Sequence, residues 1–331
     1  MPIWRPEAYQ GARRRRRYFE GWYFKHVTAG MEESWSFIPG ISRGESRGEG
    51  YAFVQAIEGN SGRTWWFQTD LESFAASESE LLVRVGDSEF SPRGARIRLS
   101  SEEVSLTGDF AYRGFHGPII KLLSPGIMGP YAFAPFMECK HGLVSLDHGI
   151  DGRLLLVEPG ARGAAPSSRE IDFSGGRGYA EKDWGSSMPE SWIWTQSNNF
   201  PRAGDSFMLS VARVPWLASS FTGFLCVGSL GGAELREATY TGARLSKLAI
   251  TERLVSLAID RATDRIEIEV ERSRGGELRA PLRGQLSRRI AESVDATLRV
   301  RWIKAGVLVF EGQAHKAGLE VVGEVNALLP S

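Results

Sequence analysis

Apolar and polar residues alternate with a period of two along much of the chain. In the segment 265–271, Ile266, Ile268 and Val270 fall on one face, while charged residues occupy the other face. The segment 298–302 alternates in the same way. Successive side chains of a β-strand point to opposite faces, so this period is typical of strands with one buried face. Long stretches of helical periodicity are scarce, and we therefore predict an all-β protein.

The second half of the chain repeats part of the first half. When the halves are laid over one another, Glu190-Ser-Trp192 falls on Glu20-Gly-Trp22, and an aromatic residue follows two positions after each tryptophan. The repeat indicates a tandem duplication into two domains, at residues 18–172 and 173–331, whose terminal strands can cross between the halves. A meander of strands removes its exposed edges by closing, so we expect two lipocalin-like antiparallel β-barrels or half-barrels.

Charge and composition exclude several classes of protein. Lys plus Arg and Asp plus Glu both number 40, so no overall field attracts nucleic acid, and we expect no nucleic-acid partner. The run of arginines from Arg13 to Arg17 is a local exception, either a solvated arm or a peripheral contact with a membrane. Two cysteines, Cys139 and Cys226, are too few for a disulfide scaffold. With no signal peptide and no long apolar run, we expect a soluble, cytoplasmic protein.

The segment 178–200 combines charges with aromatic rings. Glu181, Lys182 and Asp183 precede Trp184 and lie close in sequence to two further tryptophans. A core strand would carry the rings without the charges, so the combination predicts a site where an apolar ligand meets a few polar groups. A carboxyl group buried among aromatic rings also has a shifted pKa, which suits a general acid. The alternative interpretation is a structural, ion-paired corner between the two domains.

Histidines are scarce, and two of the five, His141 and His148, lie within one short segment. With Asp147 and Glu181, His141 could supply metal ligands, but no His-x-x-x-His pair occurs, so we expect no metal. The pattern Gly-x-Ser-x-Gly occurs at residues 40–44 and 44–48, but helical periodicity is scarce and no helix is expected to follow it, so we do not expect a serine hydrolase. His141 therefore joins Glu181 and Asp183 as a candidate for the general acid.

Three motifs resemble those of the tocopherol cyclase family, in its bacterial branch. They are Phe19-Glu-Gly-Trp-Tyr-Phe-Lys25, Met137-Glu-Cys-Lys-His-Gly142, and Tyr179-Ala-Glu-Lys-Asp-Trp-Gly185 followed by Trp192-x-Trp194-x-Gln196-x-Asn198. The resemblance runs from residue 18 to the tail Gly318-Leu-Glu-Val-Val-Gly323 and implies a lipocalin-like fold. In the third motif, the plant members have asparagine where this chain has Asp183.

The resemblance implies an isomerase that closes a chroman ring on a prenylated quinol. Asp183, Glu181 or His141 protonates the alkene, and the phenol oxygen captures the tertiary cation. Aromatic faces stabilise the cation. The expected substrate-binding residues are Trp22, Tyr23, Trp184, Trp192, Trp194, Gln196 and Asn198. Addition of O–H across an alkene changes no overall oxidation state, and no dinucleotide or phosphate-loop motif occurs, so we expect no cofactor.

Two other functions fit the same residues. The first is a non-catalytic binding protein for an apolar isoprenoid or quinone, with the same cavity and no chemistry. The second is a terpenoid hydratase, in which a water molecule captures the cation instead of the phenol. In all three cases the expected partner is a small apolar isoprenoid or a prenylated quinol.

Overall fold

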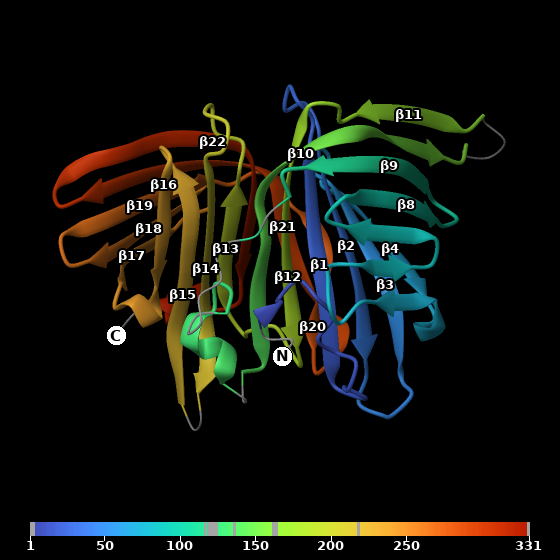
Figure 1. The fold of residues 1–331 in the computed structure, drawn as a ribbon, viewed down its shortest axis with the longest axis horizontal. Helices are drawn as coiled ribbons and strands as arrows, with labels where there is room; N and C mark the ends of the chain where they lie inside the picture. Colours follow the sequence, from blue (N-terminus) through green and yellow to red (C-terminus); the bar gives the residue numbers. More distant parts are fainter. Residues whose placement is uncertain are drawn as a thin grey trace.

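The chain folds into two antiparallel β-sheets that stand side by side (Figure 1). The computed structural model describes residues 4–115, 117, 125–134, 137–160, 165–216 and 219–329. Strands dominate, which confirms the all-β prediction, and the helices with described bounds are 3₁₀ turns: η2 (Leu71–Ser73), η3 (Gly129–Phe133), η5 (Thr239–Thr241) and η6 (Val325–Leu328). Within the described part of the chain, no helix is long and apolar enough to span a bilayer.

The first sheet is built from the strands of the first half of the chain. These are β1 (Tyr18–Val27), β2 (Ser34–Arg43), β3 (Gly50–Glu58), β4 (Arg63–Thr69), β5 (Phe74–Ala76), β6 (Val83–Val85), β7 (Ser88–Ser91), β8 (Gly94–Ser100), β9 (Ser105–Arg113), β10 (Cys139–Glu158), β11 (Ser167–Asp172) and β12 (Gly176–Gly185). Their order is β4-β3-β2-β1-β12-β10-β9-β8-β7-β6-β5, and β11 pairs with β10 outside this path. A strand from beyond residue 172, β12, therefore lies between β1 and β10.

The second sheet is built from the remaining strands. These are β13 (Trp192–Ser197), β14 (Ser206–Trp216), β15 (Ser219–Leu230), β16 (Ala233–Ala238), β17 (Arg244–Ile250), β18 (Leu254–Arg261), β19 (Asp264–Glu271), β20 (Gly276–Leu282), β21 (Gln285–Lys304) and β22 (Val307–Val322). Their order is β16-β15-β14-β13-β22-β21-β19-β18-β17, and β20 pairs with β21 outside this path. The strand β20 reaches across to the first sheet, where it contacts β3 and β4.

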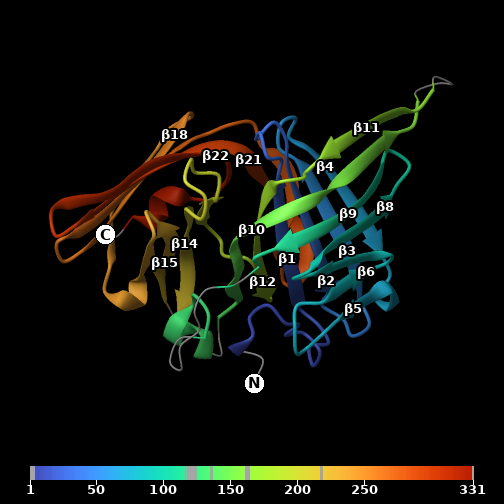
Figure 2. The same cartoon turned by 45° about the horizontal axis from the view of Figure 1, so that its top comes forward.

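The two sheets share one strand order. In each, a four-stranded meander is followed by a late strand, β12 or β22, and then by β10 or β21. This matched order is what the internal repeat predicts. Among the described strands neither path closes into a ring, since the first ends at β4 and β5 and the second at β16 and β17. The first sheet curls until β6 contacts β2 and β3 (Figure 2), so both sheets are curved but open.

The alternation in the sequence corresponds to burial in the strands. Ile266 and Ile268 on β19 are buried, and they pair with Trp302 and Val300 on β21, which are buried as well. The intervening charged side chains point to the other face, as a period of two requires. One-sided burial of this kind explains why these segments form strands of an antiparallel sheet with a solvated face.

Three apolar clusters make up the interior. One fills the concave side of the first sheet, and another fills the second sheet. The third lies between the sheets, with Tyr23 and Tyr179 from the first and Trp194 and Val294 from the second. Strands β1 and β12 therefore have two buried faces, one toward the first cluster and one toward the layer between the sheets. This layer holds the candidate site.

Candidate active site

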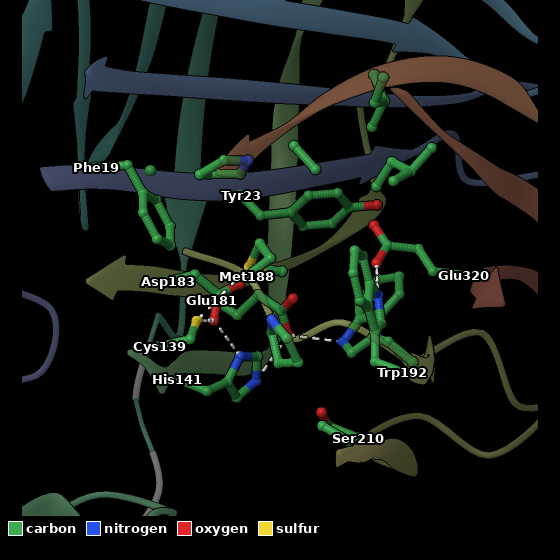
Figure 3. Close-up of a pocket in the computed structure, with 18 of the residues that line it drawn as sticks. Phe19, Tyr23, Cys139, His141, Glu181, Asp183, Met188, Trp192, Ser210 and Glu320 are labelled. Carbon is green, nitrogen blue, oxygen red and sulfur yellow. Dashed lines mark hydrogen bonds and ion pairs between the residues drawn. The ribbon is translucent and has the colours of Figure 1, made fainter. Parts of the chain in front are cut away.

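A cavity lies in the layer between the two sheets. Its volume is about 180 Å³, below the roughly 300–1,000 Å³ of typical sites for drug-sized ligands. Apolar and aromatic side chains form most of the wall, including Phe19, Tyr23, Ile38, Phe53, Trp192 and Trp194 (Figure 3). Carboxyl and imidazole groups also reach it: His141, Glu181, Asp183, Glu292 and Glu320. An apolar wall with a few polar groups is typical of a site for an apolar small molecule.

Strand β12 presents alternate residues to the cavity and to the core of the first sheet. Glu181 and Asp183 line the cavity. Lys182 and Trp184 point to the opposite face, because side chains alternate along a strand. The run of charged and aromatic residues predicted to form one site is therefore divided between two environments.

His141 on β10 lies opposite Asp183 on β12 in the strand register. Its Nδ1 is 2.8 Å from a carboxylate oxygen of Asp183, and its Nε2 is 3.4 Å from a carboxylate oxygen of Glu181 (Figure 3). Burial lowers the pKa of His141, but the two carboxylates outweigh burial and raise the pKa well above its usual value. At neutral pH, His141 is therefore an imidazolium held between Glu181 and Asp183.

Two neighbouring side chains hold Glu181 in place. The hydroxyl of Tyr179 donates a hydrogen bond to its carboxylate, and the indole Nε1 of Trp194 donates another at 3.1 Å. Both donors are buried, so they fix the carboxylate without exposing it to water. The three predicted residues for the general acid, His141, Glu181 and Asp183, are thus brought together at one end of the cavity.

The same three residues could offer ligand atoms to a metal, since these atoms lie within 4.8 Å of one another. The ligand set considered from the sequence included Asp147, but Asp147 pairs with Arg177 at 2.8 Å and accepts a hydrogen bond from Asn198 at 2.8 Å. Histidine ligates a metal only as the neutral ring. A metal at this position would therefore have to displace the proton of His141, which the two carboxylates stabilise.

A second pair of carboxyl groups reaches the cavity from the other sheet. Glu292 on β21 and Glu320 on β22 are register partners, and the charge of Glu292 acts on Glu320. The Tyr23 hydroxyl donates to Glu292 at 2.7 Å, and the Trp192 indole donates to Glu320.

The surroundings of this pair favour the neutral acid. Burial raises the pKa of Glu292, and burial together with the charge of Glu292 raises the pKa of Glu320 well above its usual value. Two carboxyl groups that share a dry site cannot both ionise readily, because like charges repel strongly at low dielectric. The pair Glu292–Glu320 therefore keeps a proton at a pH where an exposed glutamate has lost it.

The sequence reasoning missed Glu292 and Glu320. Glu320 lies between Leu319 and Val321, where a glutamate ordinarily belongs to the solvated face of a strand, whereas Glu292 shares the face of Ile290 and Val294. One signal was present, because Glu320 falls within the motif at residues 318–323 between Leu319 and Val321. Their partnership, however, follows from the register of β21 and β22, which the sequence does not display.

Trp22 and Trp184, expected to bind substrate, lie outside the cavity in the core of the first sheet. Between them lies Lys182, whose Nζ is 4.8 Å and 4.7 Å from the two ring centroids. The same Nζ is 2.5 Å from a carboxylate oxygen of Glu20, and both side chains are fully buried. This group matches the structural interpretation of an ion-paired corner.

Gln196 and Asn198 also lie behind the cavity wall. Gln196 accepts a hydrogen bond from Lys25 at 3.3 Å, and Asn198 donates to Asp147 and to the backbone oxygen of Gly178, both at 2.8 Å. These bonds join the second sheet to the first. The expected substrate-binding residues that line the cavity are Tyr23, Trp192 and Trp194.

Fold and site together define an all-β protein whose two sheets hold an aromatic, acid-lined cavity between them. The family model described as "Tocopherol cyclase-like" matches residues 155–323, more than half of the chain. The chain belongs to the tocopherol cyclase-like family. The matched segment contains Glu181, Asp183, Glu292 and Glu320, whereas His141 precedes it.

Two solved structures of CghA show the same fold at low sequence identity. CghA has a TM-score of 0.55 and 9% identity, over 93% of this chain and 89% of CghA. CghA with Sch210972 has a TM-score of 0.54 and 10% identity, over 92% and 89%. Kievitone hydratase from Nectria haematococca has a TM-score of 0.48 and 11% identity, over 93% and 88%. No curated protein sequence matches the chain.

Proposed function

We propose that this protein is an intramolecular cyclase, which protonates an alkene of a prenylated quinol and closes a chroman ring. The observation that carries the proposal is the pair Glu292–Glu320, which keeps a proton in an aromatic cavity. Family membership supports the class of reaction. The apolar wall supports an apolar substrate, since it offers few partners to a strongly polar one.

The two groups of titratable residues suit different roles. His141 holds its proton tightly because Asp183 and Glu181 stabilise the imidazolium, so it is a weak donor. The Glu292–Glu320 pair keeps its proton through burial and the repulsion of like charges, without a fixed counter-ion that holds the proton in place, and we therefore assign the donor to this pair. This changes the role expected from the sequence, where His141, Glu181 and Asp183 were the candidate acids. Two carboxylates around one imidazolium leave a net negative charge, which suits a proton acceptor and a counter-ion to a cation.

The reaction balances without a cofactor. The donor carboxyl passes its proton to the less substituted alkene carbon, which leaves a tertiary cation. Tyr23, Trp192 and Trp194 line the cavity. Each ring whose face meets the cation stabilises it by about 0.5–2 kcal/mol. The phenol oxygen forms the new C–O bond, and its proton returns to a carboxylate of the cavity. One C–H and one C–O bond form while one O–H bond and one π bond are lost.

The volume of the cavity limits how much of the substrate it can enclose. A volume of about 180 Å³ accommodates the quinol ring with the reacting end of the prenyl chain, while a phytyl tail extends toward the open edge. Holding the phenol oxygen against the alkene removes the entropic cost of bringing the two groups together during the reaction. In the best oriented systems this saving is on the order of 7–11 kcal/mol.

The test is anaerobic incubation of the protein with dimethylallyl, geranyl and phytyl methylbenzoquinols, followed by chromatography and mass spectrometry. A chromanol of unchanged mass and shifted retention supports the cyclase. Quinol that co-elutes unchanged supports the binding protein, and a product heavier by one water supports the hydratase. Absence of both binding and product would refute this substrate class.

Two variants separate the roles of the acids. Glu320→Gln keeps the shape of the side chain and removes the acid, so we expect kcat to fall by about 10²–10⁴-fold with ligand binding retained. The matched control is Glu269→Gln on the exposed face of β19, which should change nothing. Asp183→Asn tests the acceptor. If Asp183→Asn abolishes turnover and Glu320→Gln leaves it intact, the donor belongs to the His141 cluster instead.

A further inference from the structure

An exposed basic run directly precedes β1, whose residue Phe19 lines the cavity. Arg13, Arg14, Arg15, Arg16 and Arg17 are all exposed. Among the described residues, Arg17 alone of these five forms an ion pair, with Glu45. Four neighbouring guanidinium groups thus have no carboxylate partner within the part of the chain that the structure describes.

Backbone contacts join this arginine run to the wall of the cavity. The amide of Arg17 donates to the oxygen of Gly44 at 2.7 Å. Gly284, in the turn between β20 and β21, packs so closely on the start of β1 that a Cβ there would lie 2.4 Å from the nitrogen of Tyr18. The same turn bonds to the loop after β12, since the amide of Gly284 donates to Ser186 at 2.6 Å.

Cavity-lining residues lie directly beside these contacts. The amide of Met188 donates to the oxygen of Pro281 at 3.0 Å, and both residues line the cavity. The next residue, Leu282, is 50% exposed.

A second exposed apolar side chain lies on the same edge. Phe133 in η3 is 49% exposed, and its ring packs edge-on against Trp4 of the N-terminal segment, at 5.9 Å between centroids. Tyr131 of the same 3₁₀ turn lines the cavity. The N-terminal segment therefore contacts Phe133 at one end and the turn after Leu282 at the other, while the backbone oxygens of Pro6 and Ala8 between them accept hydrogen bonds from Lys182.

We propose that this edge, defined by residues 13–17, Phe133 and Leu282, docks on the surface of an anionic lipid bilayer. Phosphate groups match the unpaired guanidinium groups, and each arginine near such a surface contributes attraction that falls off within a Debye length. Phe133 and Leu282 enter the boundary between headgroups and acyl chains. An apolar substrate then passes from lipid to cavity without crossing water. This transfer of substrate from lipid to cavity rests on the proposed function, whereas docking on the bilayer does not.

The experiment is flotation of the full chain, without substrate, with phosphatidylcholine vesicles prepared with and without phosphatidylglycerol. We expect binding to the anionic vesicles at low salt, weak binding to the neutral ones, and loss of binding as salt rises. Replacing Arg13 to Arg16 by glutamine should weaken binding by at least about tenfold. Leu282→Gln should weaken it several-fold at constant charge, which separates insertion from simple charge attraction.

A matched control lies at the far end of the second sheet. Leu308 in the β21–β22 hairpin is 47% exposed but distant from the cavity lining, so Leu308→Gln should leave vesicle binding unchanged. The proposal is overturned if wild-type protein does not float with anionic vesicles, or if the arginine variant floats equally well. It is also overturned if Leu308→Gln alone abolishes binding, or if the protein retains heparin without binding vesicles. None of these outcomes depends on turnover, so failure of the cyclase proposal leaves the test intact.

Discussion

Neighbouring residues of β12 enter two different environments, and the contrast explains much of this protein. Lys182 points into the core of the first sheet, where Glu20 neutralises it and two tryptophan rings cover it. Glu181 and Asp183 point into the cavity, where they hold His141 as an imidazolium. Both clusters contain buried charge beside aromatic rings. In the first, the opposite charges match in number.

The cavity cluster is not neutralised in this way. Two carboxylates face a single imidazolium, and a second pair of carboxyl groups, Glu292 and Glu320, lies in the same cavity. A site with unbalanced charge and open space is where a ligand or a proton can change the balance. The comparison teaches that buried charges beside aromatic rings do not identify a site by themselves. Buried charges mark a site only where open space lies beside them and where one sign of charge is in excess.

The largest effect is expected from a variant that disrupts the Lys182–Glu20 pair in the core of the first sheet. Lys182→Met leaves Glu20 buried without its partner, so we expect unfolding to become easier by about 3–5 kcal/mol. The measurement is urea unfolding followed by tryptophan fluorescence. Replacing Glu20 by leucine in the same chain should recover part of the loss, because it removes the uncompensated charge.

The adjacent residue provides the control for this comparison. Asp183→Asn on the cavity side should change the free energy of unfolding by about 1 kcal/mol or less, because His141 keeps Glu181 as a partner. Equal destabilisation by Lys182→Met and Asp183→Asn would contradict the division of β12 into a structural face and a cavity face.

The next effect is on the pH dependence of activity, which tests the role of the Glu292–Glu320 pair. The proposed donor is active while protonated, and burial raises the pKa of Glu292 and of Glu320. Activity should therefore persist well above the usual pKa of a glutamate and then fall about tenfold per pH unit as the pair loses its proton. The measurement is kcat/KM against pH, with folding monitored at each point. Activity that rises through this range would show that an ionised carboxylate, not the neutral acid, is required.

The smallest effect compares one tryptophan from each environment. Trp194→Phe removes the indole donor to Glu181, so we expect kcat/KM to fall several-fold, corresponding to about 1 kcal/mol. Trp184→Phe weakens the contact of a ring with Lys182 and should lower stability by about 0.5–2 kcal/mol without changing kcat/KM. The measurements are kcat/KM and the thermal unfolding of both variants. The opposite pattern would place Trp184, not Trp194, at the ligand.

Much of the fold could be predicted because it depends on local pattern. Alternation at Ile266 and Ile268 requires a strand with one buried face, whichever strand lies beside it. The candidate residues His141, Glu181 and Asp183 could be predicted as well, since their residue types within the motifs already suggested acid chemistry. Their meeting at one end of the cavity needed only the antiparallel pairing of β10 with β12.

The rest could not be predicted from the sequence, because it depends on pairing and on which face is inside. Trp22 and Trp184 carry the same composition signal as Trp192 and Trp194, yet they lie on the other side of the first sheet. In most antiparallel sheets one face is solvated and alternation reveals it. Strands β1 and β12 are buried on both faces, so their sequence gives no indication of which face meets the cavity.

The sequence by itself determined the all-β class and singled out His141, Glu181 and Asp183, which the structure brings together. Period-two alternation and motif composition are properties of consecutive residues, so they can be read from one strand at a time. Only the tertiary structure decided that Lys182 is neutralised in a core while its two neighbours face a cavity. Only it joined Glu292 to Glu320, since the register of β21 and β22 is set by packing over the whole sheet. The free energy that keeps a proton on this pair comes from burial between two sheets, and burial is a property of the assembled layers.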